Sequence, residues 1–223
     1  MMSMKKQKKV LVLSAHPDDA ELSVGGTIAR FRHLGADVTV FNVTTSEYSA
    51  KAAERRRQAA AEAAQILGHR LIWAEDGRHN QVEDIPEYRL VTMIDSIVAD
   101  ERPDIVIGPW AGDSHVDHTR LARATLASSR RWDADLYACC PGEYRTVCYH
   151  RFEPNVFVDI GPFVEQKRAA IRVFDYQDQG FRRLEQEILP RLWSYYGALS
   201  GYESAEGLLL LRARWPTNGF LNS

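Results

Sequence analysis

The stretch VLVLSAHPDD, residues 10–19, decides the fold of this chain. Its first four residues are apolar and alternate valine with leucine, which is typical of a strand buried in a parallel sheet. Polar residues follow at once, namely His16, Asp18 and Asp19. In an open α/β sheet, ligands bind outside the carboxyl ends of the strands. The stretch therefore predicts a buried strand and a candidate active site at its end.

A second polar cluster, SHVDH at residues 114–118, follows another apolar run, IVI at residues 105–107. Imidazoles and carboxylates of this kind bind divalent metals and can also transfer protons. Because both clusters follow strand-like runs, we expect them to converge on one crevice.

The first two-thirds of the chain alternates strand-like with helix-like segments, which predicts a mostly parallel sheet covered by helices on both faces. The expected strands are Val10–Ser14, Val38–Thr44, Leu71–Trp73, Ile105–Gly108 and Val156–Asp159. The expected helices are Leu22–Leu34, Lys51–Leu67, Pro86–Asp100, Val116–Ser129, Pro162–Phe174 and Phe181–Tyr196, the last of them bent or restarted at Pro190. The run Leu208–Leu211 is too short to assign to strand or helix. We find no linker or internal repeat and expect one α/β domain over residues 1–223.

Composition narrows the class of protein. The 223 residues carry a formal charge of −2 without a basic patch, so we expect no nucleic-acid partner. No stretch reaches the roughly 20 apolar residues of a membrane span, and the basic start precedes a run too short for a signal peptide, so we expect no membrane partner. Three cysteines without C-x-x-C spacing look like reduced thiols. We therefore expect a cytoplasmic protein.

The two clusters offer the ligands of a catalytic metal site with three protein groups. His16, Asp19 and His118 are the candidate ligands, which leaves Asp18 free as a base. His115 would face the reacting group, and Asp117 would orient it by accepting its other N–H. The alternative is structural: one aspartate caps a helix, and the histidines lie on the surface at a helix start. One cap does not account for two adjacent carboxylates and an imidazole.

These segments resemble the PIG-L/LmbE family of metal-dependent N-deacetylases. The resemblance rests on AHPDDAE at residues 15–21 with GGT at residues 25–27, and on HVDH at residues 115–118, where the family usually has His-Pro-Asp-His. It covers nearly the whole chain, including Arg56 before Leu67-Gly68 and the segment Lys167–Gln177.

The resemblance implies a Rossmann-like fold and removal of an acetyl group from a small N-acetylglucosamine-type sugar, with Zn²⁺ or another divalent metal as cofactor. It implies the same three ligands, with Asp18 as general base and His115 as oxyanion stabiliser. Arg56 matches a substrate-contacting arginine, for which the adjacent Arg57 is an alternative. Asp113 stands near the reaction centre where some members have a tyrosine, so it is a candidate for contacting substrate. Members of the family often form homo-oligomers.

Trp110 follows the fourth strand and is a candidate for stacking on a sugar ring. Two other functions compete with the deacetylase. A nucleotide-binding Rossmann protein would need G-x-G-x-x-G, which the Gly25-Gly26 pair does not supply. A non-catalytic carbohydrate-binding protein would not need the ligands and the base together. Among hydrolases, the acyl group could differ, or the sugar could belong to an antibiotic or a nucleotide.

Overall fold

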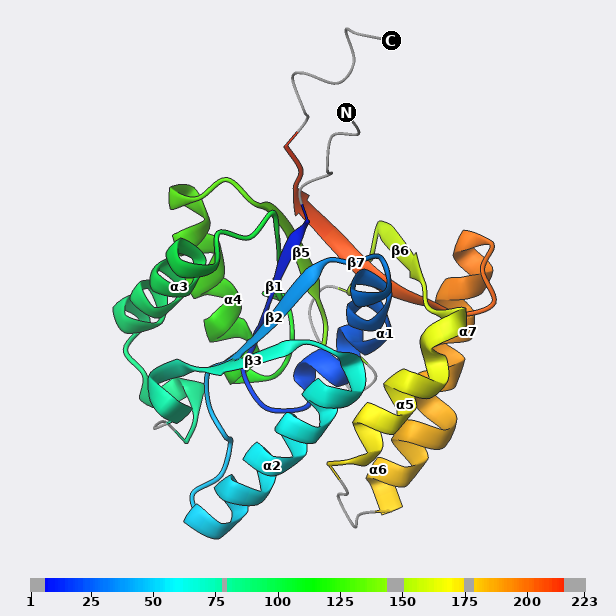
Figure 1. The fold of residues 1–223 in the computed structure, drawn as a ribbon, viewed down its shortest axis with the longest axis horizontal. Coiled ribbons are helices and arrows are strands. Elements are labelled where there is room, and N and C mark those ends of the chain that lie inside the picture. The colour runs from blue at the N-terminus through cyan, green and yellow to red at the C-terminus, as the bar shows by residue number, and fades with distance from the viewer. Residues whose placement is uncertain (1–6, 78–79, 144–150, 175–178, 215–223) are drawn as a thin grey trace, which may run out of the picture.

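The computed structural model describes residues 7–77, 80–143, 151–174 and 179–214. Its core is one seven-stranded sheet in the order β3-β2-β1-β4-β5-β7-β6 (Figure 1). The strands are β1 (Lys9–Ser14), β2 (Asp37–Asn42), β3 (Arg70–Trp73), β4 (Ile105–Pro109), β5 (Asp135–Cys139), β6 (Val156–Asp159) and β7 (Ala205–Arg212). The first five strands run parallel, and β7 pairs antiparallel with both β5 and β6. The prediction of a mostly parallel sheet is confirmed.

Helices cover both faces of this sheet. They are α1 (Asp19–His33), α2 (Ala50–Leu67), α3 (Glu87–Glu101), α4 (Val116–Ser128), α5 (Val164–Arg172), α6 (Gln179–Arg183) and α7 (Leu189–Ser200). A π-helical segment, Leu184–Ile188, lies between α6 and α7, and Pro190 is the second residue of α7. An α-helix therefore restarts next to the proline, which lacks an N–H for the helical ladder but fits the first turn of a helix.

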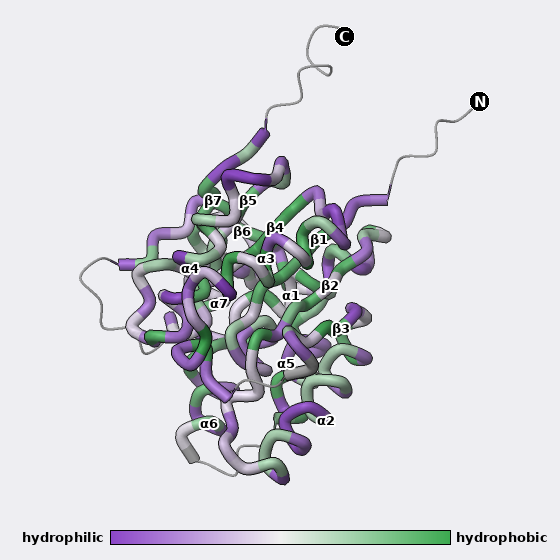
Figure 2. The backbone as a smooth tube through the Cα atoms, turned by 90° about the vertical axis from the view of Figure 1, so that its left-hand side faces the viewer, coloured by the Kyte–Doolittle hydropathy of each residue, from purple (hydrophilic) through white to green (hydrophobic). Residues whose placement is uncertain are grey.

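The alternation of side chains along β1 divides the core into two layers. Val10 and Val12 pack with α1, α2 and α5, whereas Leu11 and Leu13 pack with α3 and α4 on the opposite face. Figure 2 shows hydrophobic residues along the central strands between more hydrophilic helices. Both faces of the strand are buried, which explains the continuous apolar run in the sequence.

The order of the strands reverses between β1 and β4, which are neighbours in the sheet. The helix after β1 packs on one face and the helix after β4 on the other. The two connections therefore diverge and leave a crevice at the carboxyl ends of the strands, where open α/β sheets bind their ligands. Both sequence motifs lie at this crevice.

One central strand was not predicted from the sequence. Strand β5, with the sequence DLYAC, is short, begins with an aspartate and ends with two small residues, so its pattern is weak. Its position between parallel β4 and antiparallel β7 gives it its structure. The run Leu208–Leu211, left unassigned above, belongs to strand β7.

In the described part of the chain, no helix has the length and apolar character needed to cross a membrane.

Candidate metal centre

The loop after β1 holds its side chains in a tight turn. The carboxylate of Asp19, the first residue of α1, accepts the backbone N–H of His16 at 2.9 Å. Asp18 precedes the helix with a φ of 113°, a left-handed conformation that side-chain-bearing residues rarely adopt. Such strain is typical of functional sites, where the surrounding structure enforces it.

Three side chains from the two motifs meet at the crevice. The ligand atoms of His16, Asp19 and His118 all lie within 4.8 Å of one another. Asp19 lies between the two rings: its Oδ2 is 3.6 Å from His16 Nδ1, and its Oδ1 is 3.2 Å from His118 Nε2. All three residues are buried. The structure thus brings together the three residues proposed as ligands.

Each imidazole also contacts a second carboxylate through its other ring nitrogen. Asp117 Oδ2 lies 2.9 Å from His16 Nε2, and Asp113 Oδ2 lies 2.8 Å from His118 Nδ1. Carboxylates in this position fix the orientation of metal-binding histidines. His118 Nε2 is buried and makes no hydrogen bond to any described residue. This unsatisfied nitrogen, facing a carboxylate, fits a bound cation.

The charges at the site favour a cation as well. Burial alone would lower the pKa of His16, but the charge of Asp19 and hydrogen bonds to Asp117 and Asp19 outweigh it and raise the pKa to about 9. Burial is likewise outweighed at His118, whose pKa rises to about 10 because of Asp19 and Asp113. Although burial opposes ionisation of Asp19, the two histidines hold its pKa well below its usual range. The carboxylates therefore form a pocket that holds positive charge.

The role expected of Asp117 differs in the structure. Its carboxylate does not accept a proton from His115; it bonds to His16 and to the backbone N–H groups of Val82 and Glu83 at 2.9 Å. The backbone N–H of Asp117 instead donates to His115 Nδ1 at 3.2 Å, because His115 is the N-cap of α4. The Asp117 side chain points back toward the first motif, where it orients a candidate ligand.

Asp113 was expected to contact substrate, but its side chain is only 1% exposed. Its Oδ1 accepts the backbone N–H of His115 at 3.0 Å, while its Oδ2 is engaged by His118. Both oxygens therefore support the second motif. The sequence offers a weak signal for this role, an aspartate five residues before a ligand histidine.

A cavity of about 410 Å³ opens over the cluster. Its lining comprises His16, Asp18, Asp19, Leu22, Ser46, Arg56, Asp113, Ser114, His115, His118, Pro141 and Gly142. The loop after β5, which contributes Pro141 and Gly142, was not anticipated, because β5 itself was missed. Asp18 and His115, proposed to act in the chemistry, both face this cavity.

Arg56 of α2 also lines the cavity. Its guanidinium lies 3.5 Å from Asp18 Oδ2, 3.6 Å from Glu47 Oε1 and 3.4 Å from the carbonyl of Thr45. Arg57 instead places its guanidinium 4.9 Å from the centre of the Trp73 ring. Of the two candidate arginines, the structure brings Arg56 to the site.

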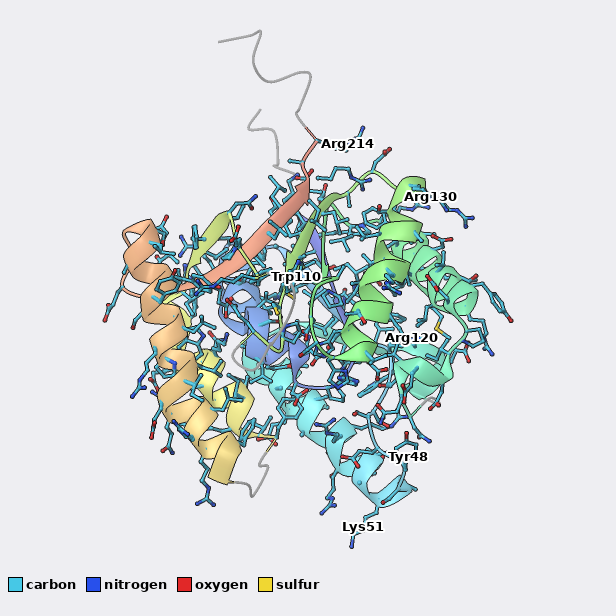
Figure 3. All side chains as sticks on the ribbon, turned by 180° about the vertical axis from the view of Figure 1, so that it is seen from behind. Tyr48, Lys51, Trp110, Arg120, Arg130 and Arg214 are labelled. Carbon is cyan, nitrogen blue, oxygen red and sulfur yellow. The ribbon has the colours of Figure 1, made fainter. Side chains whose placement is uncertain are left out.

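Trp110 does not line the cavity. Its ring lies 5.4 Å from that of Phe152 and borders a separate small pocket next to α4 and β5. In Figure 3 it lies near the centre of the view, distant from Lys51 at the start of α2 and from Tyr48 just before this helix. The expected stacking on a substrate at this site is therefore not supported, because the indole packs beside Phe152 and lines the other pocket. Gln177, at the end of the segment matched above, lies outside the described residues.

Known proteins resemble this chain in sequence and in fold. Residues 11–129 match the family described as GlcNAc-PI de-N-acetylase, PIG-L. The chain is 30% identical to a diacetylchitobiose deacetylase from Thermococcus kodakarensis over 222 residues, covering 90% of this chain and 82% of that protein. It is 31% identical to a 1D-myo-inositol 2-acetamido-2-deoxy-alpha-D-glucopyranoside deacetylase from Nocardia farcinica over 56% of this chain, which spans about half (54%) of that protein.

A solved structure shows the same fold. The N,N′-diacetylchitobiose deacetylase from Pyrococcus horikoshii superimposes with a TM-score of 0.77 at 24% identity, covering 93% of this chain and 85% of that one. The family match covers more than half of the chain, and it includes both motifs that build the cluster. The chain therefore belongs to the PIG-L family of de-N-acetylases.

Proposed function

We propose that this protein is a zinc-dependent deacetylase that removes the acetyl group from a small N-acetylglucosamine-type sugar. The observation that carries the proposal is the buried cluster of His16, Asp19 and His118, open to a cavity that also holds Asp18 and His115. Nitrogen and oxygen donors in a set of three suit a catalytic zinc site. A zinc ion held there would supply the Lewis acidity that activates water near neutral pH.

Asp18 is the proposed general base. It lies next to a candidate ligand in the chain and faces the same cavity, so it can take a proton from the attacking water. The same carboxyl group can then return the proton to the departing sugar amine. Arg56 Nη2, 3.5 Å from Asp18 Oδ2, limits the directions in which this carboxylate can turn.

His115 is the proposed oxyanion stabiliser. Because its Nδ1 accepts the backbone N–H of Asp117, the ring proton of the neutral form lies on Nε2. Burial and the nearby charges of His118 and His16 lower the pKa of His115. The neutral ring then provides one N–H to the oxygen that becomes negative as the amide is attacked, an interaction typically worth about 3 kcal/mol.

The cavity volume of about 410 Å³ falls in the range of small-molecule sites. Relatives named for a chitobiose and for an inositol glycoside suggest an N-acetylated sugar with a second ring attached. The planar donors of Arg56 suit the hydroxyls or a phosphate of that second ring. Two further points remain predictions: a cytoplasmic location, which rests on the cysteine pattern, and assembly into a homo-oligomer.

The test is acetate release by zinc-reconstituted protein from N-acetylglucosamine, N,N′-diacetylchitobiose and an N-acetylglucosaminyl inositol. We expect acetate and free amine in equal amounts, loss of turnover after chelation, and recovery when zinc is restored. Protein that holds zinc but cleaves none of the three would refute the proposed substrate class. Cleavage confined to longer N-acyl groups would favour the alternative hydrolase.

A further inference from the structure

Helix α1 is broken five residues after it begins. Val24 has non-helical angles, φ −135° and ψ 19°. In a continuous helix, the N–H of Gly26 would bond to the carbonyl of Leu22, and the N–H of Thr27 to the carbonyl of Ser23. The break therefore leaves N–H and C=O groups in the middle of a buried helix in need of other partners.

Glu206, on strand β7, accepts both N–H groups. The N–H of Gly26 donates to Glu206 Oε1 at 2.9 Å, and the N–H of Thr27 donates to Oε2 at 2.7 Å. The carboxylate thus caps the second half of α1 from inside the protein, as an acidic residue caps a helix N-terminus.

Lys167, on α5, completes the arrangement. Its ammonium donates to the carbonyl of Leu22 at 2.8 Å and to Glu206 Oε1 at 2.6 Å, and it lies 4.8 Å from the centre of the Trp193 ring. Its side chain is 0% exposed and that of Glu206 is 2% exposed. The two side chains replace the hydrogen bonds that the break removes.

The paired glycines of the first motif make room for this contact. A Cβ atom on Gly26 would lie 2.6 Å from Ile160 Cγ2 and 3.1 Å from Glu206 Oε1. One on Gly25 would lie 3.2 Å from Lys167 Cγ. The glycines therefore serve the approach of β7 and α5 to α1, which explains a part of the motif that the metal cluster does not use.

Stability alone is a poor reason to bury such a pair. Removing two charges from water costs about as much as their attraction returns, and apolar residues of similar volume are often as stable or more so. The position of the pair is more informative, because the first turn of α1, Asp19–Ser23, lies between the metal cluster and the break. Leu22, whose carbonyl Lys167 holds, also lines the catalytic cavity.

We propose that Lys167 and Glu206 are positioning residues that fix the first turn of α1 and thereby hold the Asp19 carboxylate between His16 and His118. The inference rests on the proposed function for the role of Asp19 as a ligand. Neither residue lines the catalytic cavity, so both act through the helix.

The test uses two variants of the full chain, Glu206→Gln and the double variant Lys167→Met with Glu206→Gln. Each N–H group uses a different oxygen of Glu206. In the amide, an NH₂ group replaces one of these oxygens, so one N–H group loses the acceptor that it faces. The double variant leaves no unpaired buried charge, which favours folding. Glu185→Gln is the matched control, because Glu185 is also buried and paired with a cation of α5, Arg168 at 2.8 Å. Among the described residues, Glu185 bonds to Arg168 and Arg172 of α5 and to none of α1.

We expect both variants to bind zinc about 10-fold more weakly in a competition titration, as with other groups that orient metal ligands. The visible spectrum of the cobalt-substituted protein should change, and kcat should fall about 10-fold with KM within twofold of wild type. Glu185→Gln should change none of these. Folded variants with wild-type zinc affinity and cobalt spectrum would overturn the inference. Wild-type protein that binds no metal would overturn the proposed function and this inference with it.

A second measurement needs no variant. If the pair couples the break in α1 to the site, zinc should slow hydrogen exchange at the amides of Gly26 and Thr27, about 10-fold relative to chelated protein. Amides of α3 serve as the control. Equal exchange with and without zinc at Gly26 and Thr27 would overturn the coupling even if neither variant folded.

Discussion

Replacing Asp113 by asparagine should weaken metal binding without touching a candidate ligand. The two oxygens of Asp113 serve different donors: Oδ2 accepts from His118 Nδ1, and Oδ1 accepts the backbone N–H of His115. Asparagine has one oxygen, so one of the two donors loses its acceptor. If the NH₂ group of the asparagine turned toward His118, Nδ1 of His118 would have to accept a hydrogen bond. The ring proton of His118 would then move from Nδ1 to Nε2, the atom that faces Asp19.

The expected loss is about 10- to 100-fold in zinc affinity, as for other carboxylates that orient metal-bound histidines. This corresponds to about 1.4–2.7 kcal/mol. The assay is a competition titration with a chelating dye at fixed pH. The control is Asp95→Asn, because Asp95 also accepts from a residue of α4, the Ser128 hydroxyl at 2.6 Å, but lies away from the site. A zinc affinity for Asp113→Asn within twofold of wild type would refute the positioning role.

Three further predictions concern the base, the arginine and the protons at the site. Asp18→Asn should retain zinc but lose at least about 100-fold in kcat, because the amide cannot accept the proton of water; loss of metal from this variant, measured by elemental analysis, would show that Asp18 is a ligand. Arg56→Ala should raise KM about 10-fold with a smaller change in kcat, and Arg57→Ala should change neither; an impaired Arg57→Ala beside a silent Arg56→Ala would contradict the placement of the arginines. The raised pKa values of about 9 for His16 and about 10 for His118 mean that both rings are protonated at pH 7, so zinc binding should release close to two protons there, measurable by calorimetry in buffers of different ionisation enthalpy. The same shifts stabilise the metal-free protein fully below pH 6.5, and this stability should fall as the pH rises through 9 to 10; a flat melting temperature between pH 7 and 10 would argue against them.

The parts of the fold that follow from local patterns were predicted well. Strand β1 is buried on both faces, so its apolar run is unambiguous, and α2 ends at Gly68, whose φ of 78° suits glycine at a helix C-terminus. Strand β5 could not be predicted in the same way, because its five residues carry only a weak strand pattern and its place in the sheet comes from pairing with β4 and β7. The organisation of the chain as one domain remains a prediction.

In the candidate site, too, some features follow from local sequence and others depend on the tertiary structure. The chemistry of its ligands is visible in two short motifs, and the adjacency of β1 and β4 brings them together. The partners of the imidazoles are not visible, because they depend on the path of the loop between β4 and α4. That loop directs Asp113 to His118 and leaves Asp117 to bond His16 from the first turn of α4. Likewise, no spacing in the sequence reveals that Trp110 lines a separate pocket and not the cavity over the cluster.

If His16, Asp19 and His118 form a metal centre, the metal content of the protein reveals it. Protein prepared without chelators, or reconstituted with zinc and desalted, should contain one zinc ion per chain by elemental analysis. His118→Ala, treated identically and shown to be folded by circular dichroism, should contain much less than one. Equal metal content in the two proteins would show that His118 is not a ligand, and no metal in the wild type after reconstitution would show that these residues form no metal centre.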